Sequence, residues 1–220
     1  MAKNEKKRQK AQARRRKREK RRQHRHGLRQ AAVPWAGGSR AATKALIRNA
    51  RSFPIHESLI SAEWRERGLA QVIFSRPAPD SRIIFGVYLV DALCLGVKNA
   101  FCNVVPAAMY EHELKRGIEA EDPLVPCDVQ FLHQIIYGSI DYARQFGLEP
   151  DPDFRLAQYV LEPRDQIPPN PDIEFGRDGK PCYVSGPNDN VDRIMQTLDQ
   201  SVGPGGYHFM IGGLPDFGDR

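Results

Sequence analysis

The sequence lacks the motifs by which several large classes of protein are recognised. It contains no GxGxxG or GxxxxGK[ST] segment, so a glycine-rich nucleotide loop is not indicated. HExxH is also absent, and the four cysteines stand at irregular spacings without a CxxC pair. Such spacing is typical neither of a zinc site nor of a secreted disulfide framework. We therefore expect free thiols in a reducing compartment, no bound metal and no cofactor.

Targeting and membrane-spanning segments are lacking as well. The basic N-terminus is not followed by the apolar region of a secretory signal. The longest apolar stretch, Ile83 to Val97, is too short to span a bilayer and is interrupted by Gly86, Asp91 and Gly96. These features predict a cytoplasmic protein without a membrane partner.

Acidic residues are scarce in the first part of the chain and abundant in the rest. Residues 1–51 hold 19 Lys and Arg against only Glu5 and Glu19, a balance of +17. Residues 52–220 hold 14 Lys and Arg against 25 Asp and Glu, a balance of −11. So sharp a change separates a basic arm from an acidic globular body. We predict a disordered basic arm and hinge at 1–38, a basic helix extending it at 39–51, and a single acidic domain at 52–216.

The basic arm has the composition of a polyanion-binding segment. From Lys3 to His26 it contains neither Gly nor Pro, but no apolar stripe that could dock a helix onto a core. Like charges four residues apart oppose helix formation until a polyanion neutralises them. No aromatic residue lies between Met1 and Pro34, so contacts with phosphates are expected rather than base stacking. The residues expected to bind nucleic acid are Lys6, Lys7, Arg8, Lys10, Arg14, Arg15, Arg16, Lys17, Arg18, Lys20, Arg21, Arg22 and Arg25.

RNA is favoured over DNA as the partner, because Arg-rich disordered arms often fold on structured RNA. The alternative is a tail that only keeps the protein soluble. After the arm, Ser39 can cap a short helix from Arg40 to Arg51. That helix either extends the binding surface of the arm or packs on the body.

The body is expected to be an α+β domain with a mostly antiparallel sheet and packed helices, because hairpin and helix signals alternate along it. Asp178-Gly179 marks a hairpin turn between Ile173–Phe175 and Cys182–Val184. The other predicted strands are 69–76, 82–90 and 207–211. The predicted helices are 57–67, with Gly68 as its stop, 110–116, 129–146 and a helix from Asn188 or Asp189 to about Ser201.

Asp91 and Lys98 are the candidate catalytic residues. Asp91 lies among apolar residues, where an unpaired carboxylate is costly, so it either binds a metal or acts as a base, or it caps a turn or pairs with Lys98. Lys98 could hold a phosphate or form a Schiff base, but a paired structural lysine is the simpler interpretation. A metal site would need further carboxylates, for which Asp128, Asp141, Asp172 and Glu174 are available. His112 and His133 are expected to be surface or core residues.

Three segments of the chain carry a resemblance to a known family: GLAQVIFSR, GVYLVDALCLGVKNAF and FGRDGKPCYVSGPND. The chain resembles an uncharacterised bacterial family whose members combine a basic N-terminal tail, an LVDxxCLGVK segment and a late FGxDGKP turn. The resemblance covers about residues 53–213 and implies a bacterial cytoplasmic protein. It implies no catalytic residue.

Three hypotheses of function follow. The first is a non-enzymatic accessory protein that docks on RNA or a ribonucleoprotein through the arm, with a protein partner for the acidic body. The second is a metal-dependent hydrolase or nuclease centred on Asp91. The third is a protein-interaction module whose tail aids solubility. The sequence favours the first, and the oligomeric state stays open.

Overall fold

The computed structural model describes residues 39–166, 168, 173–187 and 189–211. The chain divides into two units, Met1–Val33 and Pro34–Arg220, and every described residue belongs to the second. The prediction of a disordered arm at 1–38 therefore falls outside the described residues, as does the end of the predicted domain beyond Ile211.

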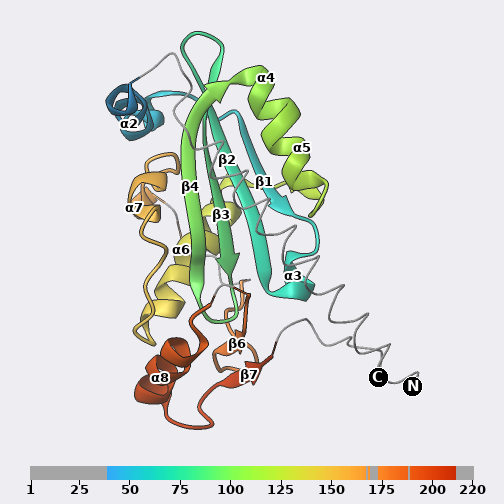
Figure 1. Ribbon diagram of the computed structural model, residues 1–220, viewed down its shortest axis with the longest axis vertical. Coiled ribbons are helices and arrows are strands. Elements are labelled where there is room, and N and C mark those ends of the chain that lie inside the picture. The colour runs from blue at the N-terminus through green and yellow to red at the C-terminus, as the bar shows by residue number, and fades with distance from the viewer. Residues whose placement is uncertain (1–38, 167, 169–172, 188, 212–220) are drawn as a thin grey trace, which may run out of the picture. The chain divides into compact units, whose positions relative to one another are not determined.

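A five-stranded antiparallel sheet forms the centre of the body, with the strand order β4-β3-β2-β1-β5 (Figure 1). Together with the helices around it, this sheet confirms the predicted α+β class. The strands are β1 (Glu57–Ser61), β2 (Leu69–Ala78), β3 (Arg82–Asp91), β4 (Gly96–Pro106) and β5 (Leu124–Pro126).

The β2–β3 hairpin forms the two inner strands beside β1 and β4, and both were predicted. Their residues are rich in Val, Ile and Phe, which fit a pleated surface covered on both faces. The ladder runs without a break from Leu69 opposite Asp91 to Ala78 opposite Arg82. Asp80 and Ser81 in the connecting loop have positive φ angles of 60° and 53°, a conformation that suits the right-handed twist of a hairpin.

Strand β4 was not predicted, and it carries a β-bulge. Val97 lies opposite Val90, whereas Asn99 lies opposite Leu89, so Lys98 is the extra residue on β4. A bulge leaves its extra residue unpaired and redirects the side chain. The bulge therefore decides where Lys98 points.

The predicted helix at 57–67 is wrong for most of its length. Residues Glu57–Ser61 form β1, which pairs with β2 and β5, and only Trp64–Arg67 are helical (α3). Leu59 and Ile60 are both buried because the sheet is covered on both faces. Adjacent apolar residues of this kind resemble a helical stripe in a short sequence window. The predicted stop at Gly68, with a φ angle of 64°, is confirmed.

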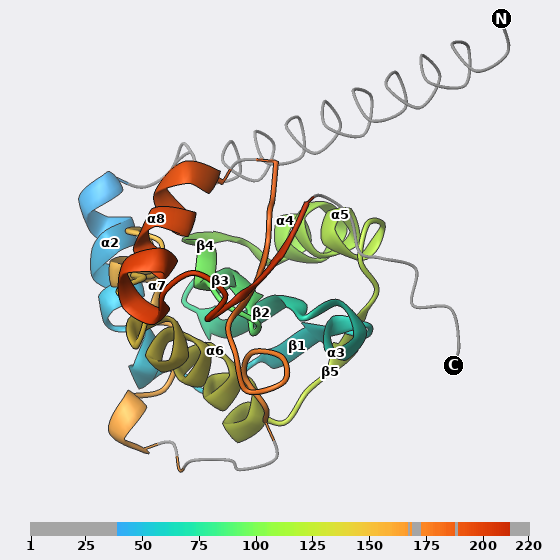
Figure 2. The ribbon, with the colours of Figure 1, turned by 90° about the horizontal axis from the view of Figure 1, so that it is seen from below.

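Helices cover the two faces of the sheet (Figure 2). On one face His133 of α6 (Val129–Arg144) lies edge-on to Phe74 of β2, with ring centroids 4.9 Å apart. On the other face Tyr110 packs on Phe85 of β3, at 5.7 Å. No helix in the described part of the chain has the length and apolar content needed to cross a bilayer. The face that contacts His133 carries α2 (Arg40–Arg48), a 3-10 turn η1 (Ala50–Ser52), α6 and α7 (Phe154–Ala157). The face that contacts Tyr110 carries α4 (Ala107–Met109), the π-helix η2 (Tyr110–Lys115) and α5 (Arg116–Glu119).

The C-terminal part forms a small parallel unit instead of the predicted hairpin. Strand β6 (Cys182–Val184) pairs in parallel with β7 (His208–Met210), and α8 (Val191–Val202) connects them. The predicted tight turn does form, since Asp178 and Gly179 have φ angles of 51° and 71°, but it closes only the single bridge between Arg177 and Lys180. A crossover helix allows parallel pairing, which a turn cannot. The cap of α8 is Asn190, one or two residues later than predicted.

Arg76 is the largest buried polar side chain, with an exposed fraction of 2%. It lies on the α6 face of β2. Its Nε donates to the Val160 carbonyl (2.8 Å), Nη1 donates to the Phe53 carbonyl (2.7 Å) and Nη2 pairs with Glu162 (2.6 Å). The guanidinium therefore joins the sheet to the chain before β1 and to the chain after α7.

Replacing Arg76 by Met should destabilise the body by about 3–5 kcal/mol, because two carbonyls and a half-buried carboxylate lose their partner. Urea unfolding followed by circular dichroism measures this loss. Arg144→Met is the matched control: that guanidinium pairs with Glu149 on the surface, where side-chain exposures are 47% and 71%. The control should cost less than about 1 kcal/mol, and an equal cost for both variants would contradict the role given to Arg76.

Candidate functional site

Asp91, at the end of β3, shapes the turn that leads to β4. Its side chain is buried, and Oδ1 accepts the N–H groups of Leu93 (3.0 Å) and Cys94 (2.9 Å). Burial raises the pKa of this carboxyl, while Lys98 and the backbone N–H groups of the turn oppose the rise. Of the alternatives considered for Asp91, these hydrogen bonds support the one in which its carboxylate caps the following turn.

Lys98 pairs with Asp189 and not with Asp91. Its Nζ lies 2.9 Å from Oδ2 of Asp189, and both side chains are mostly buried. The same oxygen accepts the N–H of Gly186 at 2.7 Å. Lys98 thereby fixes the loop before α8 to β4. Lys98 is thus a paired lysine, as the simpler interpretation held, but its partner is Asp189 and not Asp91, the partner named in one of the alternatives.

The other carboxylates considered for a metal centre do not gather around Asp91. Asp128 caps α6 by accepting the N–H of Phe131 at 2.9 Å, Asp141 pairs with Arg164, and Glu174 is exposed. Asp172 lies outside the described residues. Within the described ranges, the one group of three or more possible metal ligands is formed by other residues, none of which is Asp91.

His133 is a core residue, whereas His112 is exposed. The Nδ1 of His133 lies 2.6 Å from the Val129 carbonyl, and the Nε2 of the same ring accepts the N–H of Glu162 at 2.7 Å. These partners assign the proton to Nδ1. Burial is the main cause that lowers the pKa of His133 to about 4, so the ring is neutral at physiological pH.

Helix α2 presents a basic face, which we define as Arg40, Lys44 and Arg48. Ser39 caps the helix by accepting the N–H of Ala42 at 3.1 Å, as predicted. Ile47 is buried, so the helix packs on the body. The three cations recur every four residues, which places them on one side of the helix, and all three are exposed. None of them has an ion pair with another described residue, and α2 contains no acidic residue.

The nucleic-acid-binding candidates from Lys6 to Arg25 lie outside the described residues. The basic face of α2 is thus the described part of the basic segment. Arg51, at the end of that segment, has a structural role: its Nε donates to the Leu161 carbonyl at 2.7 Å, and its guanidinium lies over the ring of Tyr159.

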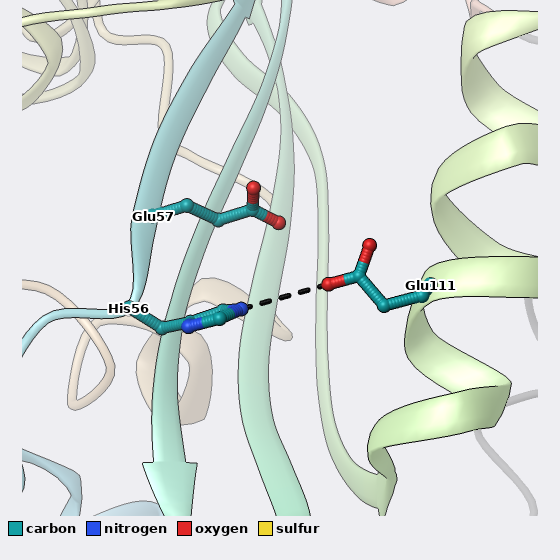
Figure 3. Close-up of side chains that lie close together, drawn as sticks. All are labelled: His56, Glu57 and Glu111. Atoms are coloured by element: carbon teal, nitrogen blue, oxygen red, sulfur yellow. Dashed lines mark ion pairs between the residues drawn. The ribbon is translucent and has the colours of Figure 1, made fainter.

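A second surface feature, which was not foreseen, joins His56, Glu57 and Glu111; we call it the His–Glu–Glu cluster (Figure 3). One possible ligand atom from each of the three side chains lies within 4.8 Å of the others. Glu57 is the first residue of β1, His56 directly precedes it, and Glu111 projects from η2. The backbone N–H of His56 donates to the Ser75 carbonyl at 2.8 Å, which fixes the position of the strand end.

Lys115 and Tyr110 complete the surroundings of this cluster. The Nζ of Lys115 lies 2.8 Å from Oε2 of Glu57 and 3.6 Å from Oε2 of Glu111. Burial opposes the charge of Lys115, but the two carboxylates outweigh it and raise the pKa of the amine. The buried Tyr110 hydroxyl donates to Oε1 of Glu57, and burial together with that carboxylate raises its pKa.

Comparison of the chain with protein-family models, with curated proteins and with solved structures found no match in any of the three. The bacterial and cytoplasmic origin implied by the family resemblance therefore stays a prediction.

Asp91→Ala should lower the free energy of unfolding by about 1–3 kcal/mol, because it leaves two N–H groups of the turn without an acceptor. Asp91→Asn should cost less, since its amide oxygen can still accept both hydrogen bonds. Urea unfolding in the presence of EDTA compares the two variants. Equal stability of Asp91→Ala and the wild type would contradict the structural role.

Protonation of His133 should weaken the body as the pH falls. Its pKa is about 4 when folded and about 6.5 when unfolded, so below 6.5 the unfolded state takes up a proton that the folded state does not. From about pH 7 to pH 5 the wild type should lose about 2 kcal/mol more stability than His133→Gln. Urea unfolding at both pH values measures this, and His112→Gln, an exposed control, should keep the wild-type pH dependence.

Proposed function

We propose that the protein is a non-enzymatic accessory factor that docks on RNA, or on a ribonucleoprotein, through its basic segment of residues 1–51. The observation that carries the proposal is the basic face of α2. Arg40, Lys44 and Arg48 are exposed without ion partners in the described part of the chain, next to the most basic stretch of the sequence. Cations with acidic partners would be less available to phosphates.

The spacing of the basic face suits a polyanion. Residues four apart on an α-helix lie about 6 Å apart along its axis, so the three side chains present a row of charge. Phosphate contacts of this kind supply affinity without reading sequence. We expect α2 to supply phosphate contacts in addition to those expected of the arm residues.

The charge of the body supports an oriented interaction. Residues 52–220 carry a balance of −11 and should repel phosphates, whereas residues 1–51 carry +17. Repulsion of one part and attraction of the other would leave the acidic body facing away from the RNA. A protein partner with a basic surface could then bind the body.

Catalysis centred on Asp91 receives less support. Both of its described hydrogen bonds serve the turn after β3, and Lys98 pairs with Asp189. These two residues have full structural roles in the body. Salt-dependent binding of RNA distinguishes RNA docking from the third hypothesis, a protein-interaction module with a solubilising tail.

Binding of a fluorescent RNA hairpin should fall steeply with salt, and the triple variant Arg40→Gln/Lys44→Gln/Arg48→Gln should reduce that dependence. Each lost phosphate contact reduces the slope of log K against log salt by about 0.7–0.9, so the triple variant should reduce it by about two to three. Fluorescence anisotropy over a series of salt concentrations gives the slope.

The matched control removes three exposed cations of the body, in the variant Arg116→Gln/Arg155→Gln/Arg193→Gln. It changes the net charge equally and should keep the wild-type slope. A slope that falls by the same amount in both variants would remove α2 from the interface. Absence of salt-dependent RNA binding by the wild type would overturn the proposed function in favour of a solubilising tail, and a duplex DNA of equal length tests the preference for RNA.

A further inference from the structure

We propose that the His–Glu–Glu cluster binds a divalent cation of the zinc class. It combines one imidazole nitrogen with carboxylate oxygens, the donor types that zinc takes from proteins. Two of the three ligands are neighbours in the sequence, His56 just before β1 and Glu57 at its first position, and the third comes from the helix packed over the sheet. A bound ion would join these two elements.

The distances in the cluster leave room for a shared ion, although His56 and Glu111 are close enough to form an ion pair when the imidazole is protonated (Figure 3). Nε2 of His56 lies 3.6 Å from Oε1 of Glu111, which is too far for a hydrogen bond. Among the described residues the His56 ring has no other hydrogen-bond partner. Two ligands of a tetrahedral ion with bonds of about 2.1 Å stand about 3.4 Å apart. The pair therefore already has nearly the separation that an ion between them requires.

The cluster is open to solvent on one side and held from the other. The side chains of His56 and Glu111 are 40% and 41% exposed, so an ion can enter and both ligands can adjust. Glu57 is 17% exposed and is oriented by the hydroxyl of Tyr110. Hydrogen bonds from such outer groups orient metal ligands and raise the affinity of a site.

The ammonium of Lys115 would compete with a cation for the carboxylates of Glu57 and Glu111. It lies between Glu57 and Glu111, at 2.8 Å and 3.6 Å, where it neutralises part of their charge. A divalent ion would take over that role and displace the amine, whose long side chain can turn toward solvent. Removing the charge of Lys115 should therefore tighten cation binding.

Titration of the full chain, without a polyhistidine tag, with zinc chloride in a calorimeter tests the proposal. We expect one equivalent to bind at the cluster, with affinity about tenfold or more lower in His56→Gln and in Glu111→Gln, each of which loses a ligand. Lys115→Met should bind zinc more tightly than the wild type. Circular dichroism and the Tm of each variant in EDTA establish that it folds.

The chain offers matched controls on the same helix. His112 and Glu113 are exposed and adjoin Glu111 but do not belong to the cluster, so His112→Gln and Glu113→Gln should bind zinc like the wild type. His24→Gln/His26→Gln tests the histidines of the arm and should also leave the equivalent intact. No zinc binding by the wild type, equal binding by His56→Gln and Glu111→Gln, or weaker binding by Lys115→Met would overturn the proposal. Because α2 lies outside the cluster, RNA docking and cation binding can fail independently.

Discussion

Burial of both faces of the β2–β3 hairpin is the constraint on which the rest of the body depends. Its ten paired positions form a continuous ladder, and most of its side chains are buried. A sheet that is apolar on both faces needs two covering layers. Helix α6 with α2 and α7 supplies one of them, and the helix from α4 to α5 supplies the other (Figure 2). Strands β1 and β4 complete the two sides of the hairpin.

Most polar groups inside this arrangement are matched by structural partners. Arg76, His133 and Asp91 each connect a strand or helix to a loop that would otherwise leave backbone groups unsatisfied. Two surface features of the described residues are less fully matched, and they differ in kind. The basic face of α2 has charge without partners among the described residues, and the His–Glu–Glu cluster has a histidine whose nearest carboxylate is too distant for a hydrogen bond.

Elements with a strong local pattern could be predicted from the sequence. Strands β2 and β3, helix α6, the stop at Gly68 and the cap at Ser39 all depend on short-range periodicity or on a single end residue. The errors came where distant contacts prevail over local preference. Strand β1 was predicted as a helix, because the pairing with β2 and β5 that makes it a strand lies outside its own sequence window. Likewise, β6 pairs with β7 across a helix instead of closing the predicted hairpin.

The sequence by itself determined the separation of a basic segment from an acidic body, because net charge depends on composition and needs no coordinates. It also determined the α+β class, through the alternation of strand and helix signals. Only the tertiary structure decided which charged groups meet. Lys98 reaches Asp189 because of a bulge, and Glu111 reaches His56 and Glu57 because a helix packs over the first strand. Such pairs form across long stretches of chain, so no spacing in the sequence can indicate them.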